Sequence, residues 1–152
     1  MSNAATVFRW DRRIRGMALL TACIGLLTGC NPAGIHPVEG KVIWKDTRQP
    51  AVELANSLIS FDQADTQTSA RGQIKPDGSF QLTTIQENDG ARVGEHVVLL
   101  MEIGRQPQAS DPTKLMPGKI PSRYATRESE LRAVIQPGLN QPTIEVERLM
   151  AP

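Results

Sequence analysis

The feature that most constrains this chain is a two-residue alternation of apolar and polar side chains, which begins near Val38 and recurs almost to the end. A helix buries one side with a period of 3.6 residues, whereas a strand with one wet face alternates strictly. The alternating runs are residues 38–45, 70–75, 80–83, 131–136 and 144–147. No segment has a convincing helical period, so these runs predict an all-β domain whose strands each bury one face.

Turn residues separate the runs at the spacing of a small β-sandwich. In residues 75–79 (KPDGS), proline presets one turn angle, aspartate bonds its own backbone and glycine takes a positive φ. This predicts a tight hairpin between residues 70–75 and 79–84. Residues 97–101 are apolar on both faces, which predicts a strand in the centre of a sheet. About seven strands without helices predict a β-sandwich.

One segment interrupts this rhythm. Residues 104–119 are sixteen mostly polar residues with three prolines and no strand pattern. Connections of this length are uncommon in compact domains and are often binding loops or mobile excursions. We expect a loop without strands here.

The first thirty residues have the three parts of an export signal. Four arginines between residues 9 and 15 form a positive start, and an apolar run extends from Met17 to Leu27. Eleven helical residues rise only about 17 Å, well short of the roughly 30 Å hydrocarbon core of a bilayer. The segment therefore predicts a cleaved signal rather than a membrane-spanning helix.

Leu27-Thr28-Gly29-Cys30 resembles the bacterial lipobox, in which a leucine and two small residues precede the modified cysteine. The resemblance implies a diacylglycerol thioether on Cys30 and signal-peptidase cleavage between Gly29 and Cys30. Two acyl chains hold a protein stably on a membrane. The resemblance therefore implies a membrane partner, reached through the lipid on Cys30.

Cleavage at this point divides the chain into three parts. Residues 1–29 are the signal peptide, residues 30–35 are the lipidated cysteine and a short tether, and residues 36–149 are the domain. Asn31 stands where an aspartate would retain a lipoprotein on the inner membrane. The expected location is the cell envelope, with the periplasmic side of the outer membrane favoured over the inner membrane.

Removal of the signal changes the charge and cysteine content. The whole chain has 17 basic and 16 acidic residues, and residues 1–29 hold four arginines and one aspartate, which leaves 13 basic and 15 acidic residues. A nucleic-acid partner would need a concentrated basic surface, so none is expected. Cys23 leaves with the signal and Cys30 carries lipid, so no disulfide is expected.

Residues suited to catalysis or metal binding are scarce. After cleavage His36 and His96 are the only histidines and no free cysteine remains, which is too few ligands for a zinc site. No nucleophile-elbow pattern surrounds a serine. We therefore expect no catalytic residue, no metal and no cofactor.

The aromatic side chains left after cleavage are Trp44, Phe61, Phe80 and Tyr124. A small sandwich without disulfides needs its large apolar side chains inside. Tyr124, beside Arg123, is the aromatic best placed to reach the surface. Tyr124 and Arg123 are therefore the candidate ligand contacts.

Three segments resemble carboxypeptidase-regulatory-like, or transthyretin-like, domains: residues 38–42 (VEGKV), 72–82 (GQIKPDGSFQL) and 90–100 (GARVGEHVVLL). Residues 120–124 (IPSRY) and 137–140 (PGLN) are similar to small envelope lipoproteins of planctomycete-type bacteria. The resemblance implies a seven-stranded, Greek-key β-sandwich of transthyretin-like or Ig-like type. It carries no catalytic residue across, because in carboxypeptidases this domain is an accessory to the enzyme.

The chain departs from this pattern at His96, where relatives commonly have an aromatic residue after Gly94-Glu95. The hydroxyisourate hydrolases resemble the chain only in fold. Their histidine- and arginine-bearing motifs and their Tyr-Arg-Gly-Ser end are absent here, which argues against that activity.

Three functions follow, in order of preference. The first is a non-catalytic envelope lipoprotein that acts as a membrane-anchored binding or scaffolding module for an envelope protein. The alternative is a carrier of a small ligand or glycan, using Tyr124 and residues 104–119. The last is a hydrolase with an unrecognised site, which a buried and charge-coupled His96 would favour.

Overall fold

The computed structural model describes residues 34–63 and 65–149. The predicted signal peptide, Gly29, Cys30 and the tether up to residue 33 lie outside these ranges. Strands make up most of the regular structure, with two short 3₁₀ helices, η1 (Val52–Leu54) and η2 (Ser122–Ala125). No helix in the described part is long and apolar enough to cross a membrane.

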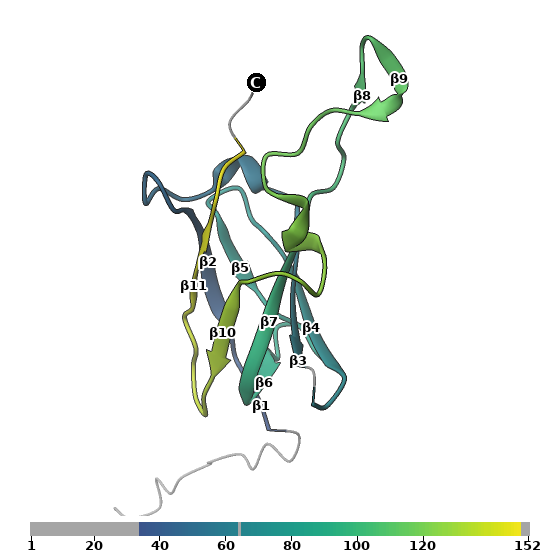
Figure 1. Ribbon diagram of the computed structural model, residues 1–152. Helices are drawn as coiled ribbons and strands as arrows, with labels where there is room; N and C mark the ends of the chain where they lie inside the picture. Colours follow the sequence, from purple (N-terminus) through teal and green to yellow (C-terminus); the bar gives the residue numbers. More distant parts are fainter. Residues whose placement is uncertain (1–33, 64, 150–152) are drawn as a thin grey trace, which may run out of the picture. The chain divides into compact units, whose positions relative to one another are not determined.

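The strands form two larger sheets and two small ones. The four-stranded sheet has the order β10-β7-β3-β4 and the three-stranded sheet the order β11-β2-β5, while β1 pairs with β6 and β8 with β9 (Figure 1). The predicted all-β class is confirmed. The bounds in chain order are β1 (Ile35–His36), β2 (Glu39–Trp44), β3 (Leu58–Gln63), β4 (Thr68–Gln73), β5 (Ser79–Gln81), β6 (Ala91–Arg92), β7 (Gly94–Met101), β8 (Pro107–Gln108), β9 (Asp111–Leu115), β10 (Arg132–Ile135) and β11 (Thr143–Val146).

The strand predicted to be central is central. β7 lies between β10 and β3 and pairs with both in antiparallel register. Its residues His96, Val98 and Leu100 are buried, and they alternate with residues that are half-buried or exposed. The apolar run is thus explained by a strand whose outer face is also partly covered.

The two larger sheets pack face to face around one core. Phe61 on β3 and Phe80 on β5 meet with ring centroids 5.8 Å apart, which joins the inner faces of the two sheets. Trp44 on β2 is also buried. The predicted interior positions of these three aromatic residues are confirmed, and the arrangement is sandwich-like.

The predicted turn at residues 75–79 is present, but the hairpin predicted around it forms only in part. The Lys75 N–H donates to the Ser79 carbonyl at 2.7 Å, and Gly78 has φ +80°. The strands on either side belong to different sheets, because β4 pairs with β3 and β5 pairs with β2. The two arms are bridged at Arg71 and Thr83, whose backbone groups exchange two hydrogen bonds of 2.8 Å. The turn carries the chain between the sheets.

The prediction of a strandless loop at residues 104–119 is also wrong. β8 and β9 pair within it as a short antiparallel hairpin that projects beyond the sandwich (Figure 1). The Asp111 carboxylate accepts hydrogen bonds from the N–H and the hydroxyl of Thr113, at 3.1 and 2.6 Å. Local hydrogen bonds, rather than apolar burial, form this hairpin.

The last strand adds a pairing that alternation does not predict. β11 runs parallel to β2, with Thr143 opposite Lys41 and Val146 opposite Trp44. These partners are about a hundred positions apart in the sequence, so the pairing brings the two ends of the domain side by side. This pairing holds the last strand of the domain against the first long one.

The domain has two distinct ends. The proximal end holds residue 34, β1 and β6, and the distal end holds η1, the β8–β9 hairpin and residue 149 (Figure 1). The distal end is closed by Lys119, whose ammonium donates to the Glu53 carbonyl at 2.6 Å and whose own carbonyl accepts from the Leu149 N–H at 2.8 Å.

Candidate functional site

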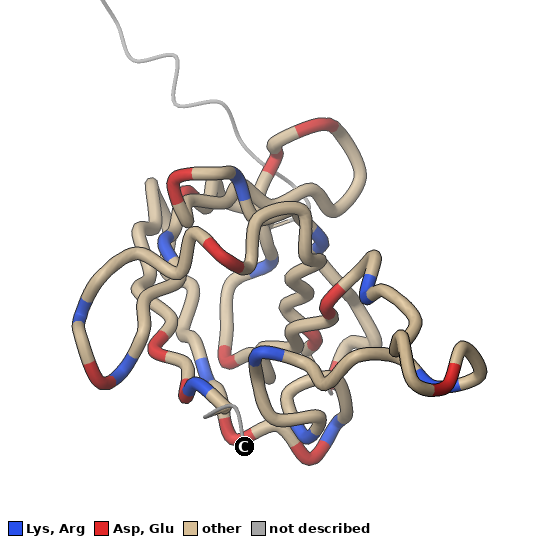
Figure 2. The backbone as a smooth tube through the Cα atoms, turned by 90° about the horizontal axis from the view of Figure 1, so that it is seen from above, with Lys and Arg blue, Asp and Glu red and all other residues tan. Residues whose placement is uncertain are grey.

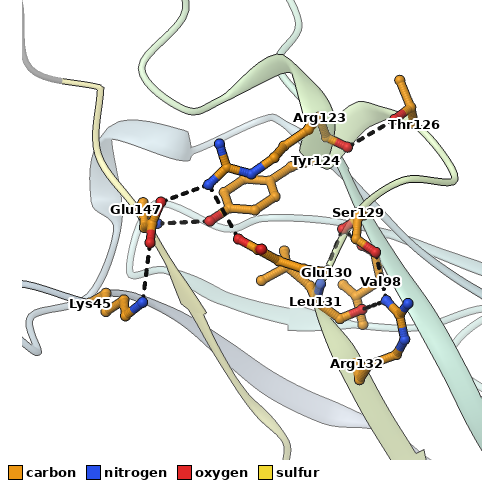
Figure 3. A network of polar contacts seen from close by, with 10 residues as sticks. All are labelled: Lys45, Val98, Arg123, Tyr124, Thr126, Ser129, Glu130, Leu131, Arg132 and Glu147. Atoms are coloured by element: carbon orange, nitrogen blue, oxygen red, sulfur yellow. Dashed lines mark hydrogen bonds and ion pairs between the residues drawn. The ribbon is translucent and has the colours of Figure 1, made fainter.

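Tyr124, the aromatic residue judged best placed to reach the surface, lies in the core. It is only 1% exposed, and its hydroxyl accepts a hydrogen bond from the backbone N–H of Glu147 at 3.3 Å. η2 packs on β7, and the Tyr124 ring and the Arg123 side chain both extend toward Glu147, with the guanidinium over the ring at 5.1 Å (Figure 3). The expectation that the large aromatic side chains lie inside is therefore confirmed for Tyr124 as well, and this candidate ligand contact offers no exposed ring face.

Arg123 is exposed but already paired. Its guanidinium lies 2.7 Å from the Glu147 carboxylate and 3.2 Å from that of Glu130 (Figure 3). Lys45 reaches the same Glu147 at 3.1 Å. Hydrogen bonds from Lys45 and Arg123 lower the pKa of Glu147, and the bond to Glu147 raises the pKa of Lys45. An anionic ligand would have to displace these carboxylates from Arg123.

The surrounding bonds show that this network fastens a long connection to the sandwich. The Ser129 hydroxyl donates to the Val98 carbonyl on β7 at 2.6 Å. The Arg132 guanidinium donates to the carbonyls of Ser129 and Leu131 at 2.6 and 2.9 Å (Figure 3). The segment between η2 and β10 is therefore tied to β7 on one side and, through Arg123, to β11 on the other. The geometry of this network is therefore that of a structural element that holds the connection in place.

The two histidines of the described domain have separate structural roles. His96 is buried beside the Phe61 ring, at 6.0 Å between centroids, and its Nε2 lies 2.7 Å from the Arg92 carbonyl. Its Nδ1 is buried without a hydrogen-bond partner among the described residues, and no carboxylate pairs with the ring. His36 Nδ1 accepts a bond from the Gly138 N–H at 3.0 Å. This is not the charge-coupled histidine that would favour a hydrolase.

Metal ligands do not gather in the part of the chain that the structure describes. No group of three or more histidine, cysteine, aspartate or glutamate side chains lies close enough to hold an ion there.

A shallow hollow of about 180 Å³ lies over β2 and β5. Lys75 donates to the Gln81 amide oxygen at 2.9 Å, and the Gln81 amide nitrogen donates to Glu39 at 3.1 Å, so these lining groups satisfy one another. Ligand pockets are usually 300 Å³ or more and mainly apolar. The hollow gives the carrier alternative no support.

Exposed apolar side chains instead gather at the distal end. Leu58 and Met101 are cross-strand partners at the ends of β3 and β7, and Ile103 follows two residues later. Val52 precedes Glu53 and Leu149 bonds Lys119, so both adjoin the contacts that close this end. We call Val52, Leu58, Met101, Ile103 and Leu149 the distal apolar group; each is between 40% and 55% exposed.

Sequence reasoning missed this group, although one signal was present. Buried residues of β7 occupy the even positions up to Leu100. Met101 and Ile103 therefore continue on the water-facing positions, where the alternation calls for polar residues. Apolar residues at water-facing positions of a strand end indicate a surface that a binding partner can cover.

Charged residues of both signs are distributed over the whole backbone in the view along the domain (Figure 2), and some of them pair near this end. Arg148 pairs with Glu53 at 3.2 Å and lies over the Trp44 ring at 4.3 Å, and the Trp44 indole donates to Glu53 at 2.8 Å. That indole bond, more than any other contact, lowers the pKa of Glu53. An apolar centre with a paired, polar rim is the composition of a protein-binding surface.

No protein family matches the chain, and comparisons with curated proteins and with solved structures likewise return no match.

Proposed function

We propose that the chain is a cell-envelope lipoprotein, anchored by lipid on Cys30, whose β-domain is a non-catalytic binding or scaffolding module. The observation that carries the anchor is the run Leu27-Thr28-Gly29-Cys30 directly after a charged and apolar leader. Asn31 supports sorting to the outer membrane.

We further propose that the domain is a seven-stranded Greek-key sandwich of transthyretin-like type. The four-stranded and three-stranded sheets, with Phe61 packed on Phe80 between them, support this assignment. In that architecture the loops and strand ends carry recognition, while the strands supply a rigid frame.

The partner, an envelope protein, contacts the distal apolar group. Support comes from the exposure of Met101 and Ile103 beside Leu58, and from the polar rim of Glu53, Glu102 and Lys119 around them. Burial of such a group removes apolar area from water, while the rim groups keep their hydrogen bonds.

Two variants separate anchoring from binding. Cys30→Ser should release the protein from the membrane fraction. Met101→Lys with Ile103→Lys should leave it in the membrane but abolish cross-linking to the envelope protein that the wild type captures. Val134→Lys is the matched control, since Val134 is also exposed but lies on β10, away from the distal group.

Each part of the proposal can fail separately. If Cys30→Ser stays in the membrane as firmly as the wild type, the anchor is wrong. If the double lysine variant captures the same protein as Val134→Lys does, the distal apolar group is not the contact.

A further inference from the structure

The proximal end gathers two loops around the start of the domain. The Gly34 carbonyl accepts from the Val93 N–H at 2.9 Å, which fixes the first described residue against the residue that follows β6. Residues 137–140 contact His36 and Pro37: the Gly138 N–H donates to His36 Nδ1, and the Asn140 N–H donates to the Pro37 carbonyl at 2.9 Å. Residues 84–90 lie against the same place, because a β-carbon on Gly90 would overlap the His36 carbonyl.

The first of these loops presents an isoleucine to solvent. Ile85 is 71% exposed, the highest value among the large apolar side chains described. The Asp89 carboxylate accepts the backbone N–H groups of Thr84, Ile85 and Gln86 at 2.7, 3.0 and 2.9 Å. Partial burial opposes ionisation of Asp89, but these N–H donors outweigh it and lower its pKa. The loop is therefore held in the shape that turns Ile85 outward.

The second loop, residues 136–140, presents a leucine to solvent. Leu139 is 61% exposed at the tip of residues 136–140. The Asn140 amide accepts from the Gln136 N–H at 2.9 Å and donates to the carbonyls of Gln136 and Gly138 at 2.8 and 2.9 Å. One asparagine side chain thus fixes the turn and keeps Leu139 out of the core.

The length of chain before this end identifies what covers it. Only three residues separate Cys30 from Gly34, and four chain steps span at most about 14 Å. A lipid on Cys30 therefore holds the proximal end at the surface of the bilayer. Both apolar loop tips would then lie within reach of the interface, where an exposed apolar side chain gains by leaving water.

We propose that the proximal end is a membrane-resting face, with Ile85 and Leu139 inserted into the interfacial region of the bilayer. This inference rests on the proposed lipidation of Cys30. Glu87 and Asp89 lie in the same loop as Ile85, so the contact is apolar and does not depend on attraction to anionic lipid. Because the distal apolar group lies at the opposite end, this orientation presents it away from the membrane.

The test uses the full lipidated protein, reconstituted into phosphatidylcholine vesicles. Single variants Ile85→Cys, Leu139→Cys and Met101→Cys each supply one free thiol for an environment-sensitive fluorophore, since Cys23 leaves with the signal and Cys30 is blocked. Met101 is the matched control, an exposed apolar position at the distal end. We expect a blue shift and quenching by brominated lipid at positions 85 and 139, unchanged at high salt, and neither effect at position 101.

Flotation with the vesicles is measured first on the same samples. If the protein does not float, the lipid anchor and the inference that rests on it are both overturned. If the protein floats but labels at 85 and 139 are as water-exposed as the label at 101, the anchor stands and the membrane-resting face is wrong.

Discussion

The α-carbon of Gly90 lies directly against the carbonyl oxygen of His36, so closely that a β-carbon on Gly90 would overlap that oxygen. Gly90 also has φ +97°, a conformation that residues with side chains rarely adopt. The loop of residues 84–90 can seat itself on β1 only because this residue has no side chain. The proximal end therefore depends on one glycine.

Gly90→Ala should lower the free energy of unfolding by about 3 kcal/mol or more, because backbone strain and steric overlap add. Gly138→Ala is the control: Gly138 has φ +104°, but nothing lies within 4 Å of a β-carbon built on it. Gly138→Ala should therefore suffer backbone strain alone, which lowers the free energy of unfolding by about 1–2 kcal/mol. Urea denaturation of both variants measures the difference. Equal losses would mean that the loop moves to relieve the overlap.

Tyr124 is expected to act through packing rather than through a ligand. Tyr124→Phe should cost about 1 kcal/mol, since only the acceptor for the Glu147 N–H is lost. Tyr124→Ala should cost about 3–5 kcal/mol, because it leaves a cavity in the core. Chemical denaturation measures both. A Tyr124→Phe variant that keeps full stability but loses partner capture would instead return Tyr124 to a binding role.

The strands could be predicted because alternation is a local property of the sequence. β2 and β11 occur where apolar and polar residues alternate. Their pairing could not be predicted in this way: Lys41 and Thr143 are parallel partners, yet nothing near either residue encodes the other. The turn at residues 75–79 could likewise be predicted from its residues. That the chain passes there from one sheet to the other could not, because this depends on how the whole core packs.

The errors have a common physical cause. Pro107–Gln108 and Asp111–Leu115 form strands without burying an apolar face, so a method based on apolar periodicity does not find them. Tyr124 was judged by its polar neighbour Arg123, but the ring is buried and the Arg123 guanidinium lies over it. The distal apolar group was missed because its members come together only when the strand ends meet.

The ion pairs of Glu147 should make stability depend on pH. Its folded-state pKa lies below the ordinary value of 4.5, so its contribution is fully present above that pH and is lost as pH falls through the lowered value. The melting temperature of Glu147→Gln should therefore be below that of the wild type at neutral pH. The two melting temperatures should converge in acid and at high salt.

Glu128→Gln is the matched control for this comparison. Glu128 carries the same charge near Glu130, but no ion pair of its side chain occurs in the described structure. Its melting temperature should follow that of the wild type across the same pH range. A gap between wild type and Glu147→Gln that stays constant down to strongly acid pH would show that Lys45 and Arg123 do not stabilise the fold through the Glu147 charge.

The β8–β9 hairpin should be dispensable for folding, whereas Lys119, four residues after the end of β9, should not be. β8 and β9 pair only with each other among the described strands. Lys119, by contrast, makes three hydrogen bonds: its backbone N–H donates to the Glu102 carboxylate at 2.9 Å, its ammonium donates to the Glu53 carbonyl, and its carbonyl accepts from the Leu149 N–H. The distal closure therefore begins just after the hairpin ends.

Two deletions that differ by two residues test this boundary. A short Gly-Ser linker in place of residues 105–117 should change the free energy of unfolding by less than about 1 kcal/mol, because loop length costs little. The same linker in place of residues 105–119 also removes the three contacts of Lys119 and should cost about 1–3 kcal/mol more. Urea denaturation of both compares them directly. Equal stability would show that the distal end is held by its apolar contacts, whereas a large loss in the shorter deletion would show that the hairpin packs on the sandwich in solution.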